Sequence, residues 1–211
     1  MPDLERETAL ARLVDTVTAA IGAADELEPA ARTTLEAVCQ ATGWPLGHLC
    51  VPADAGEEFV SSGIWAGAVD RFPVLCELSA GTRFRRGSDL VGRAAAGRPV
   101  WSADVTGDPL CVRARQGREL GVRAAFAFPV VAADGVAAVL EFFSPRVVPP
   151  DELLLGVTAG LGHQLGRVVD RRKAHQLLES SRNRLEQIIE TSVEGFVSMD
   201  AAGRVTGWNG A

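Results

Sequence analysis

Apolar positions in the first forty residues recur at steps of three and four, the spacing of one helical face. A first helix is therefore predicted over residues 4–21. Its apolar face consists of Leu10, Leu13, Val14, Val17 and Ile21. A second helix is predicted to begin near Pro29 and to end at Gly43, where the stripe stops.

Beyond residue 45 the period shortens to two, which is typical of strands. Residues 46–52 and 58–65 predict a hairpin around Ala-Asp-Ala-Gly. Residues 124–131 and 136–144 predict a second hairpin, around Ala-Ala-Asp-Gly. The order of elements therefore predicts an α+β fold with a central antiparallel sheet and helices on both faces.

The segment between the two hairpins predicts shorter elements. A helix is expected over residues 68–79, although Pro73 interrupts it unless it lies in the first turn. A short helix over residues 88–96 and a strand around Val100 follow. Residues 106–121 are polar and are expected to lie on the surface or over a cavity.

A long helix is predicted to begin at "PPDELLL" and to run from Leu154 to Ser192. Its 3-4 spacing predicts a coiled coil in which polar positions fix the register. We expect it to pass conformational signals along a seam of Arg171, His175, Leu178, Arg182, Leu185 and Ile189. Close packing is expected to compensate for its four glycines, Gly156, Gly160, Gly162 and Gly166.

Composition and charge narrow the classes of partner. The chain is 47% hydrophobic and 23% charged, as is usual for a globular protein, and its net charge of -6 gives no general attraction to nucleic acid or anionic lipid. The four cysteines lack the C-x-x-C spacing of zinc or thioredoxin-like sites. A cytoplasmic location with reduced thiols is expected, and no metal site is predicted.

Five segments carry a resemblance to the GAF domain family. They are "ATGWPLGH" (41–48), "GSDLVGRAAAGRPVWSADV" (87–105), "GVRAAFAFPV" (121–130), "GVAAVLEFFS" (135–144) and "DELLLGVTAGLGHQLGRVV" (151–169). The resemblance implies a GAF domain over residues 23–172, after an N-terminal helix at residues 1–22.

The segment "RLEQIIETSVEGFVSMDAAGRVTGWNGA" resembles the start of a PAS domain. It predicts a hairpin with strands over residues 195–200 and 204–208. A linker helix is expected over residues 173–192 and the PAS start over residues 193–211, with the rest of that domain beyond residue 211. Together these resemblances imply a bacterial multidomain signalling protein of the sensor histidine kinase type.

A GAF domain implies a cavity between the sheet and its covering loops. The candidate lining residues are Trp65, Phe84, Trp101, Cys111, Arg123, Phe126, Phe128 and Glu141. Strand alternation places Glu141 with Val139 and Phe143 on one face of the sheet. If that face borders the cavity, the carboxylate needs a partner, for which Arg123 is the candidate; alternatively, Glu141 faces solvent or a helix end.

The resemblance also limits the ligand classes. The cyclic-nucleotide motif is absent, and Cys111 is followed by Val112 rather than by the histidine common in bilin-binding members. The three histidines, His48, His163 and His175, lack a paired haem ligand. Members that reduce free methionine sulfoxide require a cysteine where Val91 stands, although Cys111 lies in the region of their other cysteine.

The sequence therefore predicts a non-enzymatic, regulatory GAF domain that forms a homodimer through its terminal helices. A small-molecule effector and a downstream signalling domain are the expected partners, with no nucleic acid and no membrane, and no cofactor is identified. Two alternatives stay open. One is a thiol-based enzyme that depends on Cys111, and the other is a pure dimerisation module.

Overall fold

The structure, a computed structural model, describes residues 2–53, 57–116, 119–190, 195 and 197–208. It divides into two compact units, Met1–Asp170 and Arg171–Ala211. The sequence-based boundary after residue 172 stays a prediction. In the described part of the chain, no helix combines the length and the apolarity needed to cross a membrane.

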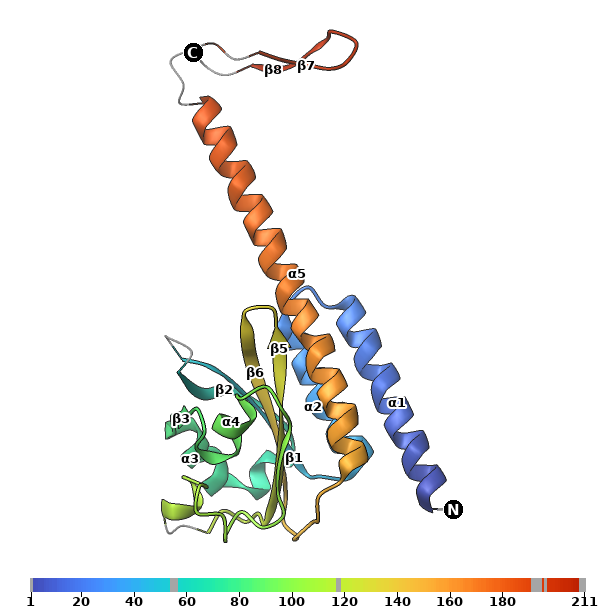
Figure 1. Cartoon of the computed structure of the whole chain (residues 1–211), viewed down its shortest axis with the longest axis vertical. Helices are drawn as coiled ribbons and strands as arrows, with labels where there is room; N and C mark the ends of the chain where they lie inside the picture. Colours follow the sequence, from blue (N-terminus) through green and yellow to red (C-terminus); the bar gives the residue numbers. More distant parts are fainter. Residues whose placement is uncertain (1, 54–56, 117–118, 191–194, 196, 209–211) are drawn as a thin grey trace. The chain divides into compact units, whose positions relative to one another are not determined.

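The first unit is built around one six-stranded sheet (Figure 1). Its strands are β1 (Leu46–Pro52), β2 (Glu58–Gly67), β3 (Phe84–Arg85), β4 (Val100–Ser102), β5 (Ala124–Ala132) and β6 (Gly135–Ser144). Their order is β3-β2-β1-β6-β5-β4, and neighbouring strands are antiparallel. The two hairpins predicted from the alternating pattern, β1–β2 and β5–β6, are present, and they lie side by side at the centre of the sheet.

Helices cover both faces of this sheet (Figure 1). They are α1 (Pro2–Ala23), α2 (Leu27–Thr42), α3 (Pro73–Gly81), α4 (Asp89–Ala94) and α5 (Glu152–Glu190), with short turns η1 (Val69–Arg71) and η2 (Ala114–Gln116). One core packs α1, α2 and the start of α5 on the sheet, and the other packs α3 and α4. The predicted fold class is confirmed.

The alternation of β6 assigns each side chain to one of these two cores. Leu140 and Phe142 belong to the layer of α1, α2 and α5, which we call the helix side. Val139 and Phe143 belong to the layer of α3 and α4, which we call the cap side. This is the alternation that the sequence predicted for this strand.

The helix predicted over residues 68–79 is two elements in the structure. Residues 69–71 form the turn η1, and α3 begins at Pro73 as its first residue. Proline has no backbone N–H and fixes its own φ, so it fits the first turn of a helix but not its interior. Pro73 therefore starts a new helix instead of continuing one.

The second unit comprises the end of α5 and a two-stranded sheet, β7 (Val197–Met199) paired with β8 (Val205–Trp208). Asp200 stabilises the turn between them by accepting hydrogen bonds from the backbone N–H groups of Ala202 and Arg204, both at 2.9 Å. The predicted hairpin is thus present. The parts of the PAS and linker predictions at residues 191–194, 196 and 209–211 lie outside the described residues.

Two glycines bring α5 into contact with the backbone of β5. A Cβ atom at Gly162 would overlap the carbonyl oxygen of Pro129, and one at Gly166 would overlap that of Val131. By contrast, a Cβ atom at Gly156 or Gly160 would meet nothing within 4 Å. Close packing therefore accounts for two of the four glycines in this helix.

We expect Gly166→Ala to lower the free energy of unfolding by about 1–3 kcal/mol, the usual cost of overpacking, because α5 must move away from β5. The matched control is Gly156→Ala, at an exposed position of the same helix, which should raise stability by up to about 1 kcal/mol through helix propensity. Urea denaturation measures both. Equal effects of the two substitutions would contradict the packing explanation.

Candidate functional site

A buried ion pair lies at the centre of the cap side. The guanidinium of Arg113 donates to both carboxylate oxygens of Glu141, from Nη1 to Oε1 at 2.8 Å and from Nη2 to Oε2 at 2.7 Å. Arg113 is 2% exposed and Glu141 is fully buried. Such a two-pronged pair fixes orientation as well as charge. Glu141 therefore faces the interior, which settles the alternative left open by the sequence.

Further groups surround the guanidinium and complete what we call the cation cage: Ser79, Phe84, Asp89, Glu141 and Phe143. Nη1 also donates to Ser79 Oγ at 3.0 Å, and Nη2 to Asp89 Oδ1 at 2.8 Å. The Arg113 Cζ lies 4.8 Å from the ring centroid of Phe84 and 5.2 Å from that of Phe143. Both are within the range of a cation–π interaction.

Electrostatics keep this network charged despite its burial. Burial alone raises the pKa of Glu141, but the charge of Arg113 and the hydrogen bond from His48 bring it down to about 2. Burial likewise disfavours the charge on Arg113, yet Asp89 and Glu141 hold its pKa well above the usual value. The cage therefore presents two acidic side chains, Glu141 and Asp89, to one cation, Arg113.

Arg113 comes from the segment between β4 and β5, residues 103–116 and 119–123 in the described chain, which we call the cap segment. Apart from the short turn η2, its described residues form no helix or strand. Asp89, which begins α4, ties this segment down: its N–H donates to the Leu110 carbonyl at 2.9 Å, and its Oδ2 accepts from the Val112 N–H at 3.0 Å. Asp89 adopts a φ of 52°, an uncommon conformation that aspartate tolerates better than most residues.

One donor of the buried arginine stays unsatisfied. Within the described residues, the Nε–H of Arg113 has no hydrogen-bond partner. Leaving a buried polar group unpaired costs about 1–3 kcal/mol. The hydrogen bonding of the Arg113 side chain is therefore complete at Nη1 and Nη2 and incomplete at Nε.

His48 extends the network away from Arg113. Because a carboxylate only accepts, we assign the proton to Nδ1, which donates to Glu141 Oε1 at 2.8 Å, while Nε2 accepts from the Ser61 hydroxyl at 2.7 Å. The ring stacks on Trp65 with centroids 3.7 Å apart. Burial lowers the pKa of His48, so the imidazole is neutral.

Three donor groups near the cage have the composition of a metal site. The ligand atoms of His48, Cys50 and Glu141 lie within 4.8 Å of one another. Burial raises the pKa of Cys50 well above its usual value, which keeps the thiol protonated. Both oxygens of Glu141 already bind the Arg113 cation, which would repel a metal ion at the same place. The carboxylate is therefore assigned to arginine and not to a metal.

Cys111 lines a small cavity beside the cage. The cavity is also bordered by Asp89 and Arg113 and holds about 10 Å³, close to the volume that one water molecule needs. Burial, followed by the charge of Asp89, raises the pKa of Cys111 to about 11. At neutral pH the sulfur is therefore a thiol, a far weaker nucleophile than the thiolate.

The structure brings together only some of the residues that the sequence proposed for the pocket. Trp65, Phe84, Cys111 and Glu141 lie at or beside the cage. Arg123 is exposed and pairs with Asp104 through a hydrogen bond of 3.1 Å from Nε to Oδ1, so it is not the partner of Glu141.

Trp101, Phe126 and Phe128 lie on the helix side, where Phe126 and Phe128 stack on Phe142. The physical reason is a β-bulge. Val131 pairs with Val136 but Val130 pairs with Ala138, so the register shifts by one residue within the hairpin. A shift of one residue exchanges the two faces of a strand pair. The aromatics consequently oppose Leu140 and Phe142 rather than Val139 and Glu141.

The sequence reasoning missed Arg113, Asp89 and Ser79. One signal was present: a carboxylate buried in an apolar strand requires a cation, and the segment expected over the cavity contains arginines at 113, 115 and 118. A sequence period shows which of several arginines faces the interior only where the backbone forms a helix or strand. The irregular cap segment offers no such period.

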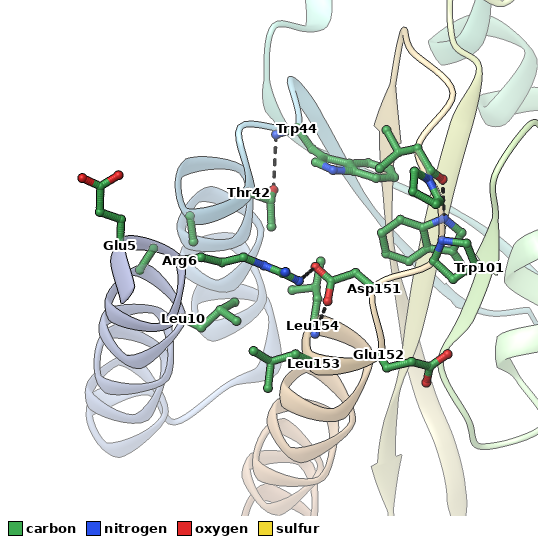
Figure 2. A pocket seen from close by; sticks show the side chains of 15 residues that line it. Glu5, Arg6, Leu10, Thr42, Trp44, Trp101, Asp151, Glu152, Leu153 and Leu154 are labelled. Atoms are coloured by element: carbon green, nitrogen blue, oxygen red, sulfur yellow. Dashed lines mark hydrogen bonds and ion pairs between the residues drawn. The ribbon is translucent and has the colours of Figure 1, made fainter. Parts of the chain in front are cut away.

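A larger, open groove lies on the helix side (Figure 2). None of its lining residues in the described chain belongs to the cage. The groove holds about 810 Å³ between α1, the end of α2 and the start of α5. Arg6 reaches across it to pair with Asp151, and Trp44 and Trp101 line its wall (Figure 2). The Arg6 side chain is about half exposed, and such pairs add little to stability. We therefore place the candidate site at the cage.

The fold agrees with the comparison of the sequence with protein families. The family model described as GAF domain matches residues 24–170. The chain belongs to the GAF domain family. Among curated proteins, no match to this chain is found. The resemblance seen in the sequence is thereby confirmed for the GAF domain itself.

Solved structures share the fold of this GAF domain at low sequence identity. The free methionine-R-sulfoxide reductase of Neisseria meningitidis, in complex with its substrate, gives a TM-score of 0.64 at 17% identity and covers 79% of this chain and 91% of that chain. The GAF domain of a phosphoenolpyruvate-protein phosphotransferase from Coxiella burnetii gives 0.64 at 17% identity, with coverage of 81% and 98%. The reduced fRMsr of Staphylococcus aureus gives 0.55 at 12% identity, with coverage of 75% and 94%.

These neighbours correct one prediction. The sequence predicted that the chain is not an enzyme, on the ground that Val91 replaces a cysteine. The reductase from Neisseria meningitidis is an enzyme with the same fold. Membership of the GAF family therefore does not make this chain a non-enzyme.

We expect Glu141→Gln to lower the free energy of unfolding by about 3 kcal/mol at pH 7, because Arg113 stays buried with half of its charge partners removed. Urea denaturation measures this change. The matched control is Asp104→Asn, which breaks the exposed pair with Arg123 and should leave the midpoint almost unchanged. Equal midpoints for the two variants would contradict a central role of the buried pair.

The same variant should alter acid stability. The folded pKa of Glu141, about 2, lies below its ordinary value of 4.5. This carboxylate therefore adds stability that is complete above about pH 5 and is lost as the pH falls through 4.5 towards 2. Denaturation curves from pH 7 to pH 2 should show a shallower decline for Glu141→Gln than for the wild type.

Proposed function

We propose that this GAF domain is a regulatory module whose ligand site is the cation cage, and that Arg113 closes this site when no effector is bound. The observation that carries the proposal is the position of the Arg113 guanidinium, which fills the space between the sheet and the cap segment. In this proposal the arginine is an internal ligand, and an effector takes its place.

The energetics of buried ion pairs support a switching role. A buried ion pair is weak support for stability, since a well-packed apolar group of similar volume often stabilises as well or better. The helix side shows that this sheet is able to pack such a core, with stacked rings of Phe126, Phe128 and Phe142. The charged cap side is therefore better explained by a function than by packing.

A short physical route leads from the cage to α5. Glu141 lies on β6, and the hairpin turn between β5 and β6 is bound to α5 because the Ala133 N–H donates to Asp170 Oδ1 at 3.0 Å. Gly166 adds a close contact between α5 and Val131. Movement of β6 after the loss of Arg113 would therefore act on the helix at the end of the first unit.

We further propose that the chain forms a homodimer through its terminal helices and acts in the cytoplasm on a following PAS domain, in a protein of the sensor histidine kinase type. The seam residues Leu178 and Leu185 have exposed fractions of 70% and 59%, which supports a covering partner. Val205 and Trp208 in the hairpin are also exposed, as expected if it belongs to a larger sheet.

A second function is favoured by one specific observation, the position of Cys111 beside the cage. In this alternative, the sulfur of Cys111 attacks the sulfur of a small sulfoxide such as free methionine sulfoxide. An external thiol then attacks Cys111. The sulfur–oxygen bond of the sulfoxide breaks, its oxygen leaves as water, and the substrate becomes a thioether. Cys111 and the external thiol form a mixed disulfide, from which a second external thiol group releases the Cys111 thiol. The raised pKa of Cys111 opposes this reaction at neutral pH.

Native mass spectrometry tests the dimer. We expect the wild type to be a dimer and Leu178→Glu/Leu185→Glu to be a monomer, because the new charges would face each other in the seam. The matched control is Ser180→Glu/Gln187→Glu, which adds the same charge on the outer face of the helix and should stay dimeric. A monomeric wild type at micromolar concentration would remove the dimer from the proposal.

For the second function, we expect turnover of free methionine-R-sulfoxide with dithiothreitol to depend on Cys111. Cys111→Ser should lower the rate by about a hundredfold or more, and the control Cys76→Ser should leave it unchanged. Because the thiol has a pKa of about 11, the rate should rise by about tenfold per pH unit between pH 7 and 9. Absence of turnover in the wild type would discard this function and leave the regulatory one.

A further inference from the structure

The residues of the cation cage lie in helices and strands, whereas Arg113, which occupies the cage, lies in an irregular segment. Glu141 and Phe143 lie on β6, Ser79 on α3, Phe84 on β3 and Asp89 at the start of α4. The cage is therefore fixed by helices and strands. Arg113 belongs to the irregular cap segment, which can move without unfolding the sheet.

The charge of the cage decides which ligand can replace the arginine. When Arg113 leaves, Asp89 and Glu141 remain as two buried carboxylates. The neighbours His48 and Cys50 are neutral and supply no positive charge. A neutral or anionic ligand would leave both carboxylates unpaired in the interior, which is strongly unfavourable. The incoming group therefore has to be a cation.

The geometry of the cage narrows the class of cation. Glu141 accepts two hydrogen bonds from the guanidinium, Asp89 and Ser79 accept one each, and the Cζ atom of Arg113 lies over the rings of Phe84 and Phe143. A flat fork of N–H donors matches this arrangement, whereas an ammonium group has three donors in a tetrahedral array.

The arginine is also incompletely held, which makes its replacement feasible. Its Nε–H lacks a partner within the described residues, and the small cavity lined by Cys111 borders the same side chain. A free ligand is not limited by the path of the cap backbone. A free ligand is therefore able to place a guanidinium group in the cage and the rest of its structure in the space that the Arg113 side chain occupies.

We propose that the cation cage recognises the guanidinium group of a small ligand, which binds by displacing Arg113. This inference rests on the proposed regulatory function and specifies its effector class. Displacement breaks the contacts between Arg113 and Asp89, and the cap segment loosens as a result. The ligand then holds the carboxylates of β6 and α4 in place of the cap.

Isothermal titration with ethylguanidinium chloride tests the proposal on the whole chain. We expect measurable binding to the wild type and about tenfold to hundredfold tighter binding to Arg113→Ala, in which the internal competitor is absent. Arg113→Ala/Glu141→Gln should lose this binding. The neutral analogue N-ethylurea and the cation ethylammonium serve as matched ligands, and each should bind Arg113→Ala at least tenfold more weakly than ethylguanidinium.

Hydrogen exchange on the wild type supplies a second measurement that does not depend on the folding of a variant. If ethylguanidinium displaces Arg113, exchange at the Val112 amide, which now donates to Asp89, should rise at least fivefold. The Leu154 amide, which donates to Asp151 Oδ1 on the helix side, should be unchanged and so controls for general destabilisation. Slower exchange at Val112 would overturn displacement.

Different results would overturn the guanidinium ligand class and the regulatory function. Equal binding of N-ethylurea or ethylammonium would overturn the guanidinium class, as would wild-type protein that shows no binding at a hundred times the dissociation constant of Arg113→Ala. If a metabolite of another class binds the wild type and alters the Val112 amide, the regulatory function stands and the guanidinium inference falls.

Discussion

The buried pair of Arg113 and Glu141 is the interaction on which the cap side of this protein depends. Two carboxylates, Glu141 and Asp89, lie in an interior where an unpaired charge is not tolerated, and one side chain from an irregular segment compensates both. The same side chain connects β6, α3 and α4 to the cap segment. The charge balance of this face therefore depends on one guanidinium group.

The two faces of the sheet use different physical means of cohesion. On the helix side, rings of Phe126, Phe128 and Phe142 stack in a row, and Gly162 and Gly166 let α5 approach the backbone of β5. Apolar packing of this kind is dense and tolerates little displacement. It gives the cage a rigid floor, so that a change in the cage is taken up by the cap segment and by the hairpin that Asp170 connects to α5.

Periodicity in the sequence predicted the architecture and placed Glu141 on the same face of β6 as Val139 and Phe143, because both depend on regular backbone. It left open whether that face is buried. It misplaced Phe126 and Phe128, because the bulge at Val130 reverses the parity that is counted from the hairpin turn. It also named Arg123, rather than Arg113, as the partner of Glu141. The cation belongs to a segment without a period, so its identity depends on the path of the cap backbone, which local patterns do not encode.

The regulatory and the catalytic proposals begin with the same physical event. Cys111 lies two residues before Arg113 in the cap segment and lines the cavity that borders the cage. Withdrawal of the arginine therefore moves the thiol as well, and it exposes a sulfur whose pKa is raised mainly by burial. A less buried Cys111 would ionise more readily. In both proposals, the strength of the Arg113–Glu141 pair would therefore set the concentration at which an effector enters and the exposure of the neighbouring cysteine.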